Sequence, residues 1–125
     1  MGTGYLIDTN VLIDAQIGRL TPIGKHYLSK IIDTDFTVSF ITYIEFLGYK
    51  DISKSSEDFI ALAKVIEIDS SIINACITLR REKSIKLPDA IIAATALAKD
   101  LVLVTRNVGD FKNILDLNII NPFEL

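Results

Sequence analysis

Five short runs of apolar residues recur along the chain, and a stretch of helical character separates each run from the next. The runs are YLI at 5–7, TVSF at 37–40, VIEI at 65–68, LVLV at 101–104 and NII at 118–120. Runs that are apolar at nearly every position are typical of strands buried on both faces of a parallel sheet. The alternation therefore predicts an α/β protein with a central parallel sheet of about five strands and helices on both faces.

Several helix starts can be located between these strands. They are predicted at Thr21-Pro22, Thr42, Ser55 and Leu87-Pro88. The last start opens AIIAATALAKD, a segment so apolar that we expect it to lie between the sheet and another surface. The polar stretch KDISKSSED at 50–58 is typical of a loop between helices, so residues 1–125 are predicted to form a single domain.

Composition narrows the classes of function. The mean hydropathy of +0.39 is high for a chain of 125 residues, so a partner is expected to cover part of the apolar surface. A net charge of −3 disfavours a protein that grips nucleic acid through its overall charge, but leaves binding through metal ions and a local basic patch open. One cysteine and one histidine exclude an internal disulfide and a multi-histidine zinc site.

The sequence shows no targeting segment. Its first residues, MGTGYLID, lack the basic and apolar regions of a signal peptide. The longest apolar stretch, AIIAATALA, is too short to span a bilayer. We therefore expect a cytoplasmic protein with no membrane partner.

Four acidic residues follow strands or open a helix. Asp8 directly follows the first strand, Glu45 follows the second, Asp89 opens the alanine-rich helix and Asp110 follows the fourth strand. Each has an ordinary explanation alone, as a helix cap, a first-turn acid or a solvated residue. Sites in open α/β sheets form at the carboxyl ends of the strands, however, so all four can reach one edge. Carboxylates gathered there repel one another, and oxygen ligands favour Mg²⁺ or Mn²⁺ as the ion that relieves the repulsion.

Four motifs, YLIDTNVLID, ITYIEFLGY, LPDAIIAATALA and LVTRNVGDF, occur in this order over essentially the whole chain. With this series the chain resembles the PIN-domain family, in particular the VapC-type ribonuclease toxins of toxin–antitoxin pairs. The resemblance implies a three-layer α/β/α fold. It assigns the family's catalytic and metal-binding quartet to Asp8, Glu45, Asp89 and Asp110, and supporting positions to Asn10, Thr105 and Asn107.

The resemblance also implies an activity and partners. The activity is Mg²⁺- or Mn²⁺-dependent hydrolysis of RNA phosphodiester bonds by metal-activated water. The partners are a second copy of the chain, in a homodimer, and a cognate antitoxin that blocks the active site. We expect the dimer to form through apolar helix faces near the N-terminal half. Asp14, one or two helical turns from Asp8, is expected to lie outside the site.

Basic residues near the acids are candidates for RNA binding. The segment RREKSIK places Arg80, Arg81, Lys83 and Lys86 just before Asp89. They form either a solvated helix end or a phosphate-binding shoulder. Arg106, inside VTRNVGD, is a candidate either for contact with a substrate phosphate or for pairing with a site acid.

Two alternative functions stay open. The first is a catalytically inactive PIN-like module that binds RNA or protein, against which the complete acidic quartet argues. The second is an aspartyl-phosphate protein, since Asp8 after a strand and Thr105 suit a receiver or a phosphatase. The phosphatase signature needs a second aspartate where this chain has Asn10, and a receiver needs paired acids where Ile7 precedes Asp8.

Overall fold

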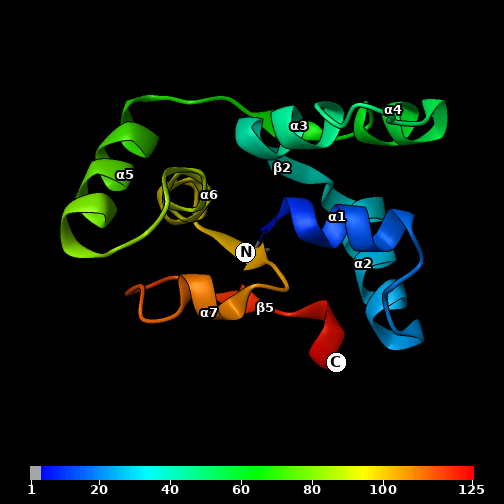
Figure 1. Ribbon diagram of the computed structural model, residues 1–125. Helices are drawn as coiled ribbons and strands as arrows, with labels where there is room; N and C mark the ends of the chain where they lie inside the picture. The colour runs from blue at the N-terminus through cyan, green and yellow to red at the C-terminus, as the bar shows by residue number, and fades with distance from the viewer. Residues whose placement is uncertain (1–3) are drawn as a thin grey trace.

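The computed structural model describes residues 4–125, in which helices and strands alternate (Figure 1). The strands are β1 (Gly4–Ile7), β2 (Thr37–Ser39), β3 (Lys64–Ile66), β4 (Leu101–Val104) and β5 (Ile119–Ile120). The helices are α1 (Thr9–Gln16), α2 (Pro22–Asp35), α3 (Phe40–Leu47), α4 (Lys54–Ile60), α5 (Ser70–Glu82), α6 (Leu87–Ala98), α7 (Val108–Phe111) and the 3-10 helix η1 (Pro122–Glu124). No helix within this range is long and apolar enough to cross a membrane.

The strand pairings in residues 4–125 are all parallel. One sheet has the order β1-β4-β5, and β2 pairs with β3 in a second. β1 and β2 are in contact, which brings the two sheets side by side. The predicted parallel sheet of about five strands is therefore confirmed.

The strands divide the apolar core into two clusters. Leu6 and Leu103 pack with side chains of α5 and α6, whereas Ile7 and Val104 pack with side chains of α1 and α2. Successive side chains of a strand point to opposite faces, so an apolar pair buries one residue on each side of the sheet. This alternation explains why YLI and LVLV are apolar at every position, and it gives the expected three-layer α/β/α arrangement.

Helix α6 lies where its composition predicts. Its residues from Ile92 to Ala96 are all buried, and the helix packs against both α5 and β4. The alanines allow close approach on both sides because they have no bulk beyond Cβ. The helix seen end-on in Figure 1 is thus held between the sheet and α5.

Three local predictions are wrong. The cap of α3 is Ser39, whose hydroxyl accepts from the Ile41 N–H at 3.2 Å, whereas Thr42 is buried inside the helix. Phe40 accordingly begins α3 rather than ending β2. The cap of α4 is Ser53, not Ser55, so part of the stretch predicted as a loop is helical. In both cases a serine placed earlier has the extended backbone that an N-cap requires.

The C-terminal helix η1 packs against α2. Gly24 makes this approach possible, since a Cβ built there would lie 2.3 Å from the carbonyl oxygen of Pro122. The segment therefore rests backbone against backbone, in a contact that a larger residue would block.

Gly24→Ala should lower the free energy of unfolding by about 1–3 kcal/mol, because the methyl group must push η1 away from α2. Chemical denaturation at neutral pH measures the change. Gly109→Ala is the matched control, since a Cβ there meets no atom within 4 Å. Equal stability of the two variants would contradict the packing argument.

Candidate functional site

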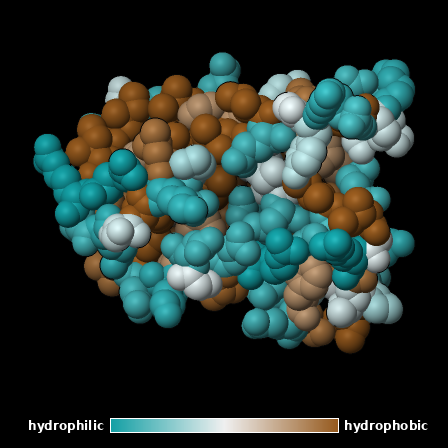
Figure 2. All heavy atoms as spheres, in the orientation of Figure 1, coloured by the Kyte–Doolittle hydropathy of each residue, from teal (hydrophilic) through white to brown (hydrophobic). Residues whose placement is uncertain are grey.

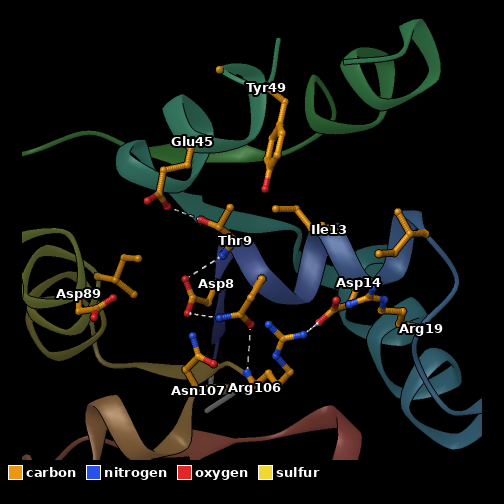
Figure 3. Close-up of a pocket in the computed structure, with 14 residues that line it drawn as sticks. Asp8, Thr9, Ile13, Asp14, Arg19, Glu45, Tyr49, Asp89, Arg106 and Asn107 are labelled. Carbon is orange, nitrogen blue, oxygen red and sulfur yellow. Dashed lines mark hydrogen bonds and ion pairs between the residues drawn. The ribbon is translucent and has the colours of Figure 1, made fainter. Parts of the chain in front are cut away.

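A polar cavity of about 610 Å³ lies beyond the carboxyl end of β1 (Figure 3). Three of the four predicted acids line it: Asp8, Glu45 and Asp89. They come from the end of β1, from α3 and from the first turn of α6. Segments far apart in the sequence thus bring carboxylates to one cavity at the predicted edge.

Asp8 is the most buried of these acids, with 5% of its surface exposed. Its backbone N–H donates to the Val104 carbonyl at 2.9 Å, which continues the pairing of β1 with β4 by one residue. Its carboxylate also accepts from the Thr9 N–H at 2.8 Å, so Asp8 is the N-cap of α1 as well as a cavity residue. The helix-capping role that the sequence offered for Asp8 is therefore confirmed, and the cap uses only one of the two carboxylate oxygens.

A network of polar groups holds the other Asp8 oxygen. Oδ2 accepts from the hydroxyl of Thr105 at 2.8 Å and from Nδ2 of Asn10 at 3.0 Å. The Thr105 hydroxyl in turn accepts from the Asn107 N–H at 3.1 Å. The three residues predicted to support the site therefore surround Asp8.

The pKa of Asp8 reflects competing influences. Burial raises it, hydrogen bonds from Thr105 and Thr9 lower it, and the charges of Asp89 and Glu45 raise it again. The net result is a pKa above the ordinary value for aspartate. Positive charge in the cavity would reverse this shift, because it favours the ionised carboxyl.

Glu45 is exposed at the opposite wall of the cavity. The Thr9 hydroxyl donates to its Oε1 at 2.6 Å and lies 3.1 Å from the Thr42 hydroxyl. Helices α1 and α3 are thereby joined beside the cavity. Thr9 was not predicted to be a site residue, although its position next to Asp8 was the available signal.

Asp89 and Asp110 are the remaining two predicted acids, and they interact through their charges. Burial raises the pKa of Asp89, the charges of Asp110 and Glu45 raise it further, and Lys86 lowers it. Asp110 is exposed in α7 and lies outside the lining of the cavity, yet its charge reaches Asp89. All four predicted acids are thus linked electrostatically.

The donor set has the chemistry of a site for a hard divalent cation, since it offers carboxylate oxygens that raise one another's pKa. Within residues 4–125, however, no three acidic, histidine or cysteine side chains are close enough to hold an ion as they stand. Glu45 is instead turned to Thr9. The residues therefore fit such an ion in kind, although they do not surround one in this arrangement.

The predicted basic residues separate into two groups. Arg106 lines the cavity, and Lys86 acts on Asp89 through its charge. Arg80 and Arg81 instead border an apolar groove between α5 and α6, and Lys83 lines a further cavity. Arg80 also donates to the Ile85 carbonyl at 2.6 Å, a bond that ties the end of α5 to the following loop.

The sequence led us to expect Asp14 outside the site, and this prediction is wrong. Asp14 lines the cavity. Its side chain is 3% exposed and pairs with Arg106, whose Nη1 donates to Oδ2 at 2.7 Å. The signal that could have found it is helical spacing, since Asn10 and Asp14 are four residues apart and both bind Arg106.

The parallel sheet and the acidic cavity define an α/β protein with its site at the carboxyl ends of the strands. The PIN domain family model matches residues 5–115. The chain belongs to the PIN domain family, and the predicted resemblance to its VapC-type members is confirmed. Comparison with curated proteins gives no match.

Three solved structures illustrate the relationship. A chain of a toxin–antitoxin complex from Klebsiella pneumoniae is 33% identical with a TM-score of 0.79, and the similarity covers 98% of this chain and 100% of that one. VapBC2 from Rickettsia felis, bound to a promoter DNA fragment, is 25% identical with a TM-score of 0.79, and the similarity covers 94% of this chain and 97% of that one. VapBC-1 from nontypeable Haemophilus influenzae is 27% identical with a TM-score of 0.76, and the similarity covers 94% of this chain and 97% of that one.

Thr105→Val should destabilise the metal-free protein by about 1.5–3 kcal/mol at neutral pH, because a buried carboxylate loses a hydrogen bond. The cost should shrink as the pH falls. Below the ordinary aspartate pKa of 3.8, Asp8 is protonated in both the folded and unfolded chains, so the hydroxyl no longer favours the folded state through the charge. Denaturation in chelator from pH 3.5 to 8 measures this dependence.

Thr105→Ser is the control for this prediction. It keeps the hydroxyl and loses only a buried methyl group, at a cost of roughly 1 kcal/mol that does not vary with pH. Parallel pH profiles for the two variants would show that the hydroxyl does not act on the Asp8 carboxyl.

Proposed function

We propose that this protein is a metal-dependent endoribonuclease, the toxin of a toxin–antitoxin pair, and that it acts in the cytoplasm. The observation that carries the proposal is the meeting of Asp8, Glu45 and Asp89 in one cavity, with Asp110 in electrostatic reach. Three separate segments supply carboxylates that are costly to ionise together. Membership in the PIN domain family supports the same activity.

The four acids would hold Mg²⁺ or Mn²⁺, as the sequence leads us to expect. When bound, such an ion makes a nearby water molecule more acidic and offsets negative charge on the phosphoryl group. The protein's own groups prepare the site for it. Thr105, Asn10 and the Thr9 N–H orient the Asp8 carboxylate, whereas Glu45 would have to leave the Thr9 hydroxyl to reach the ion.

The partner that we propose is a cognate antitoxin. Several solved structures with the same fold are toxin–antitoxin complexes, including those from Klebsiella pneumoniae and Rickettsia felis. A second cleft adjoins the acidic cavity and shares Ile13, Ile17 and Tyr49 with it. Ile17 and Tyr49 are more than half exposed, so a bound antitoxin segment would cover apolar surface while it closes the cavity.

Replacement of Asp89 by Asn tests the nuclease. If Asp89 binds the ion, Mg²⁺-dependent cleavage of a structured RNA panel should fall on the order of 100-fold or more, since ligand loss exceeds the loss of a supporting residue. The wild-type melting temperature should rise with Mg²⁺ or Mn²⁺. At an ion concentration of about 100 times Kd, the free energy of unfolding should increase by about 2.7 kcal/mol. The variant should show a smaller rise.

Glu57→Gln is the matched control for this test. Glu57 is an exposed acid in the first turn of α4, so it resembles Asp89 in its place on a helix but lies outside the acidic cavity. Full cleavage by Asp89→Asn would refute the site. A wild-type protein that binds RNA in the presence of Mg²⁺ but never cuts it would favour the inactive binding module instead.

The homodimer is also part of the proposal, and an apolar groove between α5 and α6 is the face that we assign to it. Its volume is about 550 Å³, and its exposed apolar residues are Ile68, Ile73, Ile77 and Leu87. Hydrophobic side chains gather over the α5 side of the molecule in Figure 2. Asp89 and Leu87 lie at the start of the same helix but line different cavities, so pairing through the groove leaves the acidic cavity accessible.

Light scattering should give twice the 13.9 kDa of one chain at micromolar concentration. Ile73→Glu should shift the protein to a monomer, because it buries an unpaired charge in the apolar interface. The control Ile23→Glu alters a residue of α2 that is 63% exposed, in the N-terminal half where the sequence led us to expect the interface. A monomeric Ile23→Glu protein beside a dimeric Ile73→Glu protein would place the interface there instead.

A further inference from the structure

Arg106 is held at the cavity by three different groups. Its backbone N–H donates to Oδ1 of Asn10 at 3.1 Å, and its Nη1 donates to Asp14 at 2.7 Å. Its guanidinium carbon lies 5.9 Å from the centre of the Phe123 ring. Figure 3 shows the Arg106 side chain beside Asp14, on the side of the cavity opposite Glu45 and Tyr49.

Asp14 occupies an unfavourable place for an acid. Its side chain is almost fully buried, and it lies in the last turn of α1, where the negative end of the helix dipole opposes a carboxylate. The ion pair with Arg106 compensates for both effects. An ion pair that includes a buried carboxylate is often no more stabilising than apolar packing of the same size, so stability alone is a weak explanation for its presence here.

Arg106 remains available to a ligand. Its side chain is 42% exposed, and the bond to Asp14 uses Nη1. A guanidinium has five N–H donors in a planar fork, so it binds a carboxylate on one edge and a phosphate on another. The cavity also needs such a cation, since its lining has four acids but only Arg19 and Arg106 as basic residues.

We propose that Asp14 is a positioning residue, whose buried carboxylate orients Arg106 to bind an RNA phosphate beside the acidic group. The inference rests on the proposed nuclease function. Phe123 supports the same orientation from η1, the segment that Gly24 allows to pack on α2. The C-terminal turn thereby contributes to the phosphate site.

The sign of one mutational effect separates this role from simple electrostatics. Asp14→Asn removes a negative charge from an acidic cavity, which by charge alone should strengthen the binding of an anionic RNA. If Asp14 positions Arg106, the same change should weaken binding about tenfold, the cost of one charge-assisted contact. Arg106→Gln should weaken binding equally, and the double variant should be no weaker than either single one.

The test measures the affinity of a fluorescent single-stranded RNA by anisotropy in Mg²⁺. Every variant carries Asp89→Asn so that the RNA stays intact, and thermal melts confirm folding. Asp14→Asn and Arg106→Gln should both lower the slope of log affinity against log salt by about 0.7, as for one lost phosphate contact. Arg106→Lys should recover the slope but not the full affinity, because it keeps the charge without the fork.

Asp58→Asn is the matched control. It removes the same charge and breaks an ion pair with Lys54 on the exposed surface of α4. RNA affinity that rises or stays constant in Asp14→Asn would overturn the proposal, as would additive losses in the double variant. Failure of the nuclease itself would be seen separately, as an Asp89-containing protein that binds RNA without cleaving it.

Discussion

The pairing of β1 with β4 is the interaction on which the site depends. Ile7 lies opposite Val104, and the next residue of each strand, Asp8 and Thr105, therefore meet through a hydrogen bond of 2.8 Å. β5 continues the sheet on the far side of β4, where the Thr105 N–H donates to the Ile120 carbonyl at 3.0 Å. The position of the buried carboxylate is thus fixed by main-chain pairing, which is more rigid than a contact between loops.

The four acids near this pairing differ in how deeply they are buried. Asp8 is buried and hydrogen-bonded, Asp89 is half-buried, and Glu45 and Asp110 are exposed. Burial and mutual repulsion raise the pKa of both Asp8 and Asp89. The same features that make the cavity unfavourable for negative charge make it receptive to positive charge. Arg106 meets part of this need, and the proposed divalent ion would meet the rest.

Much of this arrangement could be predicted from the sequence. The apolar runs predicted the strands because strands buried on both faces carry few polar residues, and the rule that sites form at strand ends predicted that Asp8 and Glu45 lie close together. The capping of α3 and α4 was predicted wrongly because neighbouring serines and threonines offer equivalent hydroxyls, and backbone conformation decides among them. Asp14 was misplaced since its burial depends on a partner that is far away in the chain. No sequence pattern showed that Phe123 would reach Arg106.

The pairing of β1 with β4 also determines when the cavity can form during translation. Asp8 and Thr105 are separated by 97 positions, so the first strand leaves the ribosome long before its partner exists. At about 5–20 residues per second, this interval is roughly 5–20 s. A nascent chain in that interval carries Asp8 without the strand that orients it. Translation thus delivers the parts of the cavity in sequence and completes it only after β4 and Thr105 have been made.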